Sequence, residues 1–273
     1  MPSSDFQPLS NVPNELWLEI ISHYRYSFDF NCPLIRQEDF TERMPLRQTL
    51  RSLSQASSTL RVLTLPFLWE RFDITAPVVQ PLNEFECLPL IRSVHVWWRS
   101  RSPTKVETLA LVKFLKTLPN LSGLQTEVYD TTQKFTRILG SASLPNITNL
   151  LMPDSLHGIF PAFPNLTTLA CPSMFVNSLA LGPAKKHFPR LEALIGLRFI
   201  NNDDHETLVE DFPHLRVLAV ANILQSNMRT LPLGELITGG KDVLRASHAG
   251  GSKLLRVWED DAAGPRLIHF ERC

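Results

Sequence analysis

Apolar residues near the start of the chain follow a helical spacing that is unusually wide. Read as a helix, residues 14–24 place six of them on one arc: Leu16, Trp17, Leu18, Ile20, Ile21 and Tyr24. At 100° per residue this arc covers roughly 200°, about twice the width that a surface helix needs to rest on its own core. The pattern therefore predicts a helix with a second apolar face that must be buried elsewhere.

A short phrase recurs six times from residue 88 onward, as LPLIRSV, LPNLSGL, LPNITNL, FPNLTTL, FPRLEAL and FPHLRVL. Its prolines fall at 89, 119, 145, 164, 189 and 213. Proline donates no hydrogen bond to a sheet, so it marks the first residue of a strand or the turn before it, and the apolar positions that follow point into a core. Helix-like segments lie between the phrases, at 102–118, where we expect Ser102 as the cap and Pro103 at the first helical position, and at 201–212. One strand, turn and helix per repeat predicts a stacked solenoid.

This repeated part resembles the leucine-rich-repeat family in an irregular form, because most proline spacings lie in or near the range of that family. The Asn or Cys ladder of the family is missing from most copies. The resemblance implies an α/β solenoid with parallel strands on the concave side and helices or loops on the convex side. The alternative is an α/β domain in which the Leu-Pro turns recur by coincidence.

The expected register assigns a set of side chains to the concave face. Those that we expect to contact a protein target are His95, Trp97, Gln125, Glu127, Leu151, Ile195, Leu197 and Ala219. The later rows are apolar, and an exposed apolar patch usually marks a binding site. Equally, the C-terminal segment 254–273 or an added helix could cover this face.

A second pattern precedes the repeats. Leucines recur at helical spacing through residues 46–74, with Ala56 and Ser57 between them, and LPFLWERFDI is expected to end the run in a proline-started turn that buries Leu68 and Trp69. Together with Val12-Pro13 and the helix that follows, this resembles an F-box, the helical module that docks on the Skp-type adaptor of cullin–RING ubiquitin ligases. The residues that the resemblance assigns to adaptor binding are Val12, Pro13, Glu15, Leu16, Ile20, Ile21, Leu50, Leu53, Leu60, Leu65, Leu68 and Trp69.

The predicted division of the chain has three parts. Residues 1–11 form a flexible tail, 12–75 the F-box-like module, and 76–273 the repeat domain. The module departs from the family because a loop at 25–45 separates its first helix from the next, and such an insertion could permit or block adaptor docking. In the alternative interpretation the N-terminal helices only cap the solenoid, as any solenoid requires.

Composition narrows the function. Lys plus Arg equals Asp plus Glu at 27 each, without a basic run, so we expect no nucleic-acid binding. No apolar run has the length of a membrane span, and the start lacks the pattern of a secretory signal, which favours the cytoplasm or nucleus. The four cysteines are far apart and do not fit zinc-ligand spacing, and no phosphate-binding loop or nucleophile motif occurs. We therefore expect a substrate-recognition subunit of a ubiquitin ligase with no catalytic residues, metal or cofactor of its own. The other possibility is a non-catalytic repeat scaffold.

Overall fold

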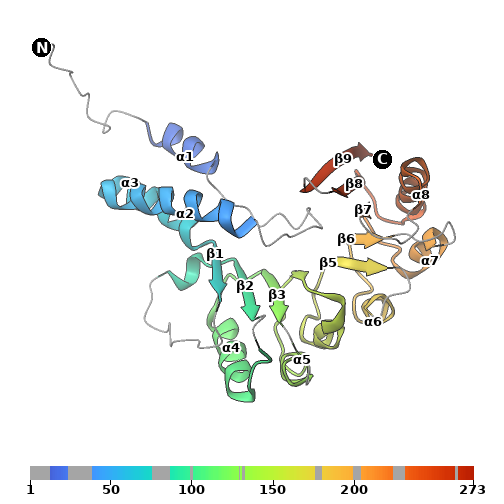
Figure 1. The fold of residues 1–273 in the computed structure, drawn as a ribbon, viewed down its shortest axis with the longest axis horizontal. Helices are drawn as coiled ribbons and strands as arrows, with labels where there is room; N and C mark the ends of the chain where they lie inside the picture. The colour runs from blue at the N-terminus through green and yellow to red at the C-terminus, as the bar shows by residue number, and fades with distance from the viewer. Residues whose placement is uncertain are drawn as a thin grey trace, which may run out of the picture. The chain divides into compact units, whose positions relative to one another are not determined.

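The computed structural model describes residues 13–23, 39–75, 87–98, 101–128, 130, 133–175, 180–198, 204–223, 231–261 and 264–273. The predicted tail 1–11, Val12 and most of the predicted 25–45 insertion lie outside these ranges. The chain divides into two compact units, which meet in the sequence between Arg71 and Phe72 (Figure 1). Each unit is described by itself.

Unit 1 is helical. It contains α1 (Asn14–His23), α2 (Asp39–Ala56) and α3 (Ser58–Trp69). Because α2 already begins at Asp39, residues 39–45 of the expected loop are helical. The helical conformation is interrupted between α2 and α3 at Ser57. Its hydroxyl oxygen accepts a hydrogen bond from the backbone N–H of Leu60 at 3.1 Å. A serine in this position satisfies one of the amides that a helix start leaves open.

The core of unit 1 is small and is built around Ile21, Leu50 and Leu68. Partly buried apolar side chains pack against these three: Trp17, Leu63, Phe67 and Trp69. The expected proline-started turn at residue 65 is wrong, since Pro66 lies inside α3 and the helix continues to Trp69. The turn interpretation failed because a proline late in a helix removes one hydrogen bond without ending the helix at that residue.

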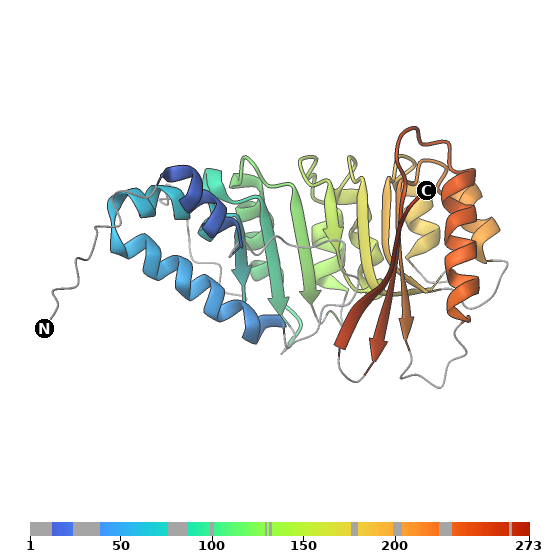
Figure 2. The ribbon, with the colours of Figure 1, turned by 90° about the horizontal axis from the view of Figure 1, so that it is seen from above.

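Unit 2 is built on one nine-stranded sheet. Its strands, in chain order, are β1 (Arg71–Ile74), β2 (Ser93–Trp98), β3 (Gly123–Val128), β4 (Asn149–Leu151), β5 (Thr168–Phe175), β6 (Ala193–Arg198), β7 (Val217–Ile223), β8 (Leu254–Asp261) and β9 (Gly264–Arg272). The order in the sheet is the order in the chain (Figure 2). Strands β2 to β8 run parallel, and β9 returns antiparallel to β8. The fold of this part is α/β with a mostly parallel sheet, as the repeated phrase predicts.

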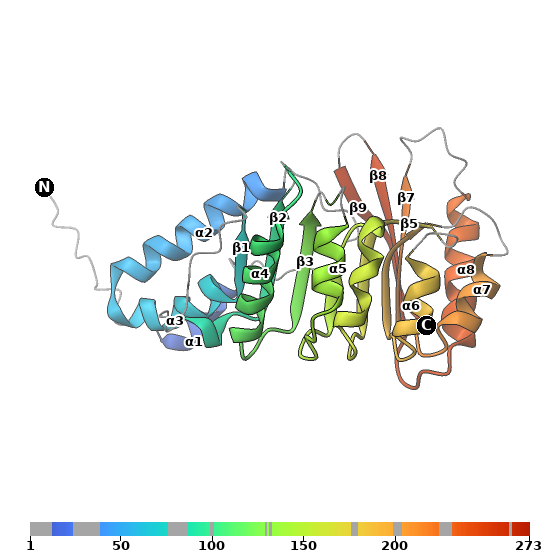
Figure 3. The same cartoon turned by 90° about the horizontal axis from the view of Figure 1, so that it is seen from below.

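The connections between strands lie on one face of the sheet (Figure 3). They are η2 (Leu88–Leu90), α4 (Lys105–Thr117), α5 (Lys134–Gly140), η3 (Asp154–Ala162), α6 (Leu181–His187), α7 (Asp204–Asp211) and α8 (Leu233–Ala246). Every second strand residue joins these helices in a continuous core, for example Val94, Leu124, Leu150 and Leu169. The alternate strand residues consequently face the opposite side, which we call the inner face.

The repeated phrase forms a turn directly before each strand. In all six copies, the carbonyl of the first residue accepts a hydrogen bond from the N–H of the fourth, as between Leu118 and Leu121 and between Phe163 and Leu166. Proline therefore sits at the second turn position, where its fixed φ suits a β-turn. The two apolar positions of the phrase are buried in every copy, so the turn and the core contacts repeat together.

A backbone ladder fixes the register between neighbouring repeats. The carbonyl of Arg92 accepts hydrogen bonds from the N–H groups of Ser122 and Gly123, and the carbonyl of Ser122 accepts from Thr148 and Asn149 in turn. The same pair of hydrogen bonds to one carbonyl recurs across the next three junctions. At the last junction only the N–H of Leu254 bonds to the carbonyl of Arg216. The final strands thus join the same stack although they lack the proline phrase.

The first long helix of unit 2 starts two residues later than expected. Its cap is Thr104, not Ser102, because Thr104 and Glu107 form a reciprocal capping box. Arg101 also donates two hydrogen bonds to the Glu107 carboxylate, and with the Thr104 donors this lowers the pKa of Glu107 to about 2. The helix start is therefore held by a charged contact as well as by its cap.

Candidate protein-interaction surfaces

Helix α1 has two faces of different accessibility. Ile21 is fully buried in the core of unit 1, and Trp17 packs beside it. Three other apolar side chains are exposed, Leu16 at 51%, Leu18 at 41% and Ile20 at 43%. Leu16 and Ile20 are four residues apart and lie together on one flank of the buried side, and we call this pair the α1 outward face. Leu18 lies on the other flank, about 160° around the helix from Ile20. The carbonyl of Pro13 accepts hydrogen bonds from Leu16 and Trp17 and so begins the helix. The wide apolar arc in the sequence thus corresponds to a buried centre with exposed apolar residues on both sides of it.

The residues assigned to adaptor binding fall into three groups in the structure. Pro13, Glu15, Leu16 and Ile20 are exposed, while Leu53, Leu65 and Trp69 are half-buried. The remaining four described residues are buried in unit 1: Ile21, Leu50, Leu60 and Leu68. These four stabilise the helices and are not available to a partner in this conformation. Helical spacing alone could not separate the two roles, because buried and exposed apolar residues recur at the same spacing.

One row of side chains crosses the inner face of unit 2 from end to end. Its members are successive register partners on β2 to β9: His95, Gln125, Leu151, Ala170, Ile195, Ala219, Arg256 and Phe270. Five of the expected target-binding residues therefore lie side by side in this inner row. Large and small side chains alternate in its middle, and polar groups stand at both ends. Arg256 lies over the Phe270 ring at 5.8 Å.

At one end of the inner row, His95 is surrounded by acidic groups. Its Nδ1 lies 3.4 Å from the Asp73 carboxylate on β1, and its Nε2 lies 3.5 Å from the Glu127 carboxylate on β3. Gln125 donates a hydrogen bond to Glu127 at 3.0 Å, and the Trp97 ring meets the imidazole edge-on at 5.7 Å. The four residues expected from the sequence on β2 and β3 thus form one cluster. Sequence reasoning missed Asp73, because β1 carries no copy of the phrase.

The inner row is less accessible than the sequence suggested. His95, Gln125, Leu151, Ile195 and Ala219 are each 2% exposed or less. The expectation of an exposed apolar patch at these positions is therefore wrong. The C-terminal segment does not lie over this face as a separate cover, since it continues the sheet as β8 and β9.

Leu197 does not belong to the inner face. It is fully buried in the core with the helices, and the register shifts between Ile195 and Leu197 where β6 pairs with β7. Gly196, at φ +87°, supplies the conformation that this irregularity requires. Strict alternation along the strand predicted the opposite face. The signal in the sequence was the glycine inside an otherwise apolar strand.

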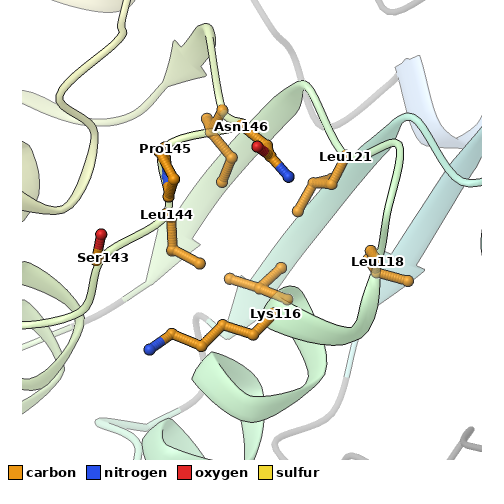
Figure 4. A pocket seen from close by; sticks show the side chains of 9 residues that line it. Lys116, Leu118, Leu121, Ser143, Leu144, Pro145 and Asn146 are labelled. Atoms are coloured by element: carbon orange, nitrogen blue, oxygen red, sulfur yellow. The ribbon is translucent and has the colours of Figure 1, made fainter.

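A small hollow opens between two of the repeated turns (Figure 4). It has a volume of about 110 Å³, and its walls come from the end of α4 and from the turns around Pro119 and Pro145. Asn120 and Asn165 each donate a hydrogen bond to the proline carbonyl of the preceding turn, at 2.6 and 3.0 Å. Asn146 makes no such bond within the described residues and lines the hollow instead.

The third turn, around Pro145, is anchored by a different contact. The N–H of Leu144 is hydrogen-bonded to the carbonyl of Ala162 in η3, at 2.8 Å. This turn is therefore held from the following segment as well as by the backbone ladder. The hydrogen bonds of Asn120 and Asn165 to the preceding turns were not foreseen from the sequence.

Two kinds of site are not found among the described residues. No group of three or more of their His, Cys, Asp or Glu side chains is arranged to hold a metal ion. Within the same ranges, no helix is both long and apolar enough to cross a bilayer.

Comparisons with known proteins give limited information. No protein-family model matches the chain, and no curated protein matches it. One similar solved structure is a crystal structure of a TLR13–ssRNA13 complex, with 18% sequence identity and a TM-score of 0.37. The match covers 58% of this chain and 23% of that chain. The function of this protein therefore has to be argued from its own surfaces.

Proposed function

We propose that this chain is the substrate-recognition subunit of a Skp–cullin–F-box ubiquitin ligase, acting in the cytoplasm or nucleus. Unit 1 docks on the Skp-type adaptor through the α1 outward face. Unit 2, as an irregular leucine-rich-repeat solenoid, binds a protein target through the inner face and its edges. No metal, cofactor, nucleic acid or membrane takes part in this function.

The observation that carries the proposal is the exposure of Leu16 and Ile20, which are neighbours on one flank of a helix whose Ile21 already lies in the core of unit 1. Exposed apolar side chains in a cluster usually mark an interaction site. Burying these two side chains, which are about half exposed, would release roughly 2 kcal/mol before association costs. Such a face alone would bind weakly, so half-buried neighbours such as Leu53 and Trp69 are expected to contribute to the same contact.

The target-binding role rests on the end of the inner face at β1 to β3, where the Asp73 and Glu127 carboxylates are partly exposed on either side of the buried His95. Two carboxylates, an imidazole and an indole converge there from three strands, which fits recognition of a polar segment of a protein. The apolar middle of the row is shielded, so contacts are expected mainly at its polar ends. The carboxylate-rich end favours a target segment that carries a positive charge.

In this proposal the chain itself provides no acid, base or nucleophile. It holds a target near a ubiquitin-loaded enzyme, so that the rate increases through proximity and orientation. The reaction takes place on residues of other subunits.

Co-expression with a Skp-type adaptor tests the proposal. A Leu16→Asp/Ile20→Asp variant removes the α1 outward face without touching the core of unit 1. The matched control is Val106→Asp, an exchange at a 77% exposed apolar position on α4 of unit 2. We expect stoichiometric capture of the adaptor by the wild type and the control, and its loss in the double variant. Circular dichroism confirms that all three chains fold.

The second candidate is a scaffold whose N-terminal helices only cap the repeats. It predicts a soluble chain that captures no adaptor and for which the double variant changes nothing. The exposed apolar side chains of α1 favour the first candidate, because a polar outer face is what makes a cap soluble.

A further inference from the structure

Strand β9 leaves one edge of the sheet open. It is the last strand in the sheet order, and among the described residues no strand pairs with its outer edge. Nine residues is long for an edge strand, and such edges are usually shortened, charged or covered, because they can pair with another chain. Here the edge carries two exposed apolar side chains, Leu267 at 42% and Phe270 at 51%.

The backbone of β9 has hydrogen-bonding groups directed at this open edge. Cys273 and Lys253 exchange both hydrogen bonds, at 2.9 and 3.4 Å, and so form a hydrogen-bonded pair between the strands. Along an antiparallel pair these alternate with non-bonded pairs. The N–H and C=O groups of Arg272 and Phe270 therefore point away from β8. After the register shift in this ladder, the same alternation assigns Leu267 to the outer edge.

The register shift also places Leu267 and Phe270 on the same face. Phe270 is opposite Arg256 and Leu267 is opposite Trp258, both on the inner side of β8. Without the shift, two residues three apart in a strand would face opposite sides. The irregularity at Ile268 thus gathers both exposed apolar side chains on the inner face of the open edge.

The charged residues of β9 follow the complementary pattern. Glu271 is opposite the core residue Leu255, and Arg266 is opposite Glu259, so both lie on the side of the helices. The two residues carry opposite charges. Glu271 directly follows Phe270, and Arg266 directly precedes Leu267. The strand is consequently symmetric about its irregularity: an apolar residue and then a charged residue on each side, with charges of opposite sign.

We infer that two copies of this chain pair antiparallel through their β9 edges, with the two-fold axis at the irregularity. Leu267 of one copy then lies opposite Phe270 of the other, and Arg266 lies opposite Glu271. Each pair has its side chains on the same face in both copies, which an antiparallel ladder requires. The outward amides of Phe270 and Leu267 form hydrogen-bonded pairs in this register, and the two sheets become one continuous sheet. Such an interface is isologous and closed, so it gives a dimer and no further growth.

Sedimentation of the full chain from micromolar to millimolar concentration tests this dimer. We expect a reversible monomer–dimer equilibrium for the wild type. Leu267→Lys or Phe270→Glu alone places a charge opposite an apolar partner and should raise the dissociation constant of the dimer roughly tenfold or more. Leu233→Lys, at a 39% exposed position on α8, is the matched control and should dimerise as the wild type does.

Mixing the two variants tests the register itself. In a mixed dimer, the new lysine at 267 meets the new glutamate at 270, and Leu267 meets Phe270 at the other pair. We expect native mass spectrometry to show the mixed dimer in large excess over either homodimer. Circular dichroism of each variant confirms that it folds. A wild type that stays monomeric over the whole range, or variants that dimerise unchanged, would overturn the inference, as would a mixture without preference.

This dimer is independent of adaptor binding. A Leu16→Asp/Ile20→Asp variant should form it with unchanged affinity, since the α1 outward face takes no part. Loss of the dimer in that variant would assign the association to α1 and refute the pairing of β9.

Discussion

Two adjacent isoleucines in α1 should contribute very differently to the stability of unit 1. Ile21 is fully buried against Leu50 and Leu68, whereas Ile20 is 43% exposed. We expect Ile21→Ala to destabilise unit 1 by about 3 kcal/mol, because it removes three buried carbons and leaves a cavity. Ile20→Ala should change the stability by less than about 0.5 kcal/mol, as is usual for surface exchanges. The pair is matched in chemistry and in helix position, so only burial differs.

Hydrogen exchange measured by mass spectrometry isolates this effect in unit 1. In peptides covering α3, a loss of about 3 kcal/mol in the free energy of opening makes hydrogen exchange roughly 150-fold faster, provided that the exchange rate is set by the opening equilibrium. Peptides from β5 to β7 of unit 2 serve as the internal reference and should not change. Equal effects of the two substitutions on α3, or a larger effect of Ile20→Ala, would refute the assignment of buried and outward faces.

Three further predictions concern unit 2. Asn120→Ala should reduce the free energy of unfolding by about 1 kcal/mol, through loss of the hydrogen bond to the preceding turn, while Asn146→Ala should leave it unchanged; urea titration compares them. Gly140→Ala should destabilise by about 2 kcal/mol or more, because the added Cβ would overlap the backbone oxygen of Gly158, and thermal unfolding measures this. The pKa of Glu107 is lowered to about 2 from an ordinary 4.5, so its contribution is complete above pH 4.5 and is lost as the pH falls toward 2. For this partly exposed contact we expect the free energy of unfolding to fall by about 1 kcal/mol over that pH range. Unfolding curves at several pH values should show this loss in the wild type and not in Glu107→Gln.

The repeated phrase predicted the sheet because its chemistry is local. A proline between two apolar residues favours a turn, and the turn sets which following residues face the core, as for Leu121 and Leu124. The phrase does not occur before β8 or β9, which join the sheet through backbone hydrogen bonds and through core side chains of β8 such as Leu255 and Val257. Leu197 was misplaced because a single glycine interrupts the alternation of β6.

The helical unit was harder to divide from the sequence. Its leucines fit one long helical pattern, and only the hydroxyl of Ser57 marks the break between α2 and α3. Buried and exposed apolar residues recur at the same spacing in α1, so spacing predicted the helix and its width but not which residues are buried. Ile21, Leu50, Leu60 and Leu68 are buried in unit 1, which the leucine spacing did not indicate. The exposed residues of α1 keep their predicted role.

Titration of a purified Skp-type adaptor against the full chain tests the central claim most directly. The claim predicts saturable binding of one adaptor per chain. Leu16→Asp should weaken this binding roughly a hundredfold, as expected for an apolar residue central to an interface, while Val106→Asp should not change it. An adaptor that does not bind the folded wild type, or that binds Leu16→Asp with the same affinity, would contradict the claim.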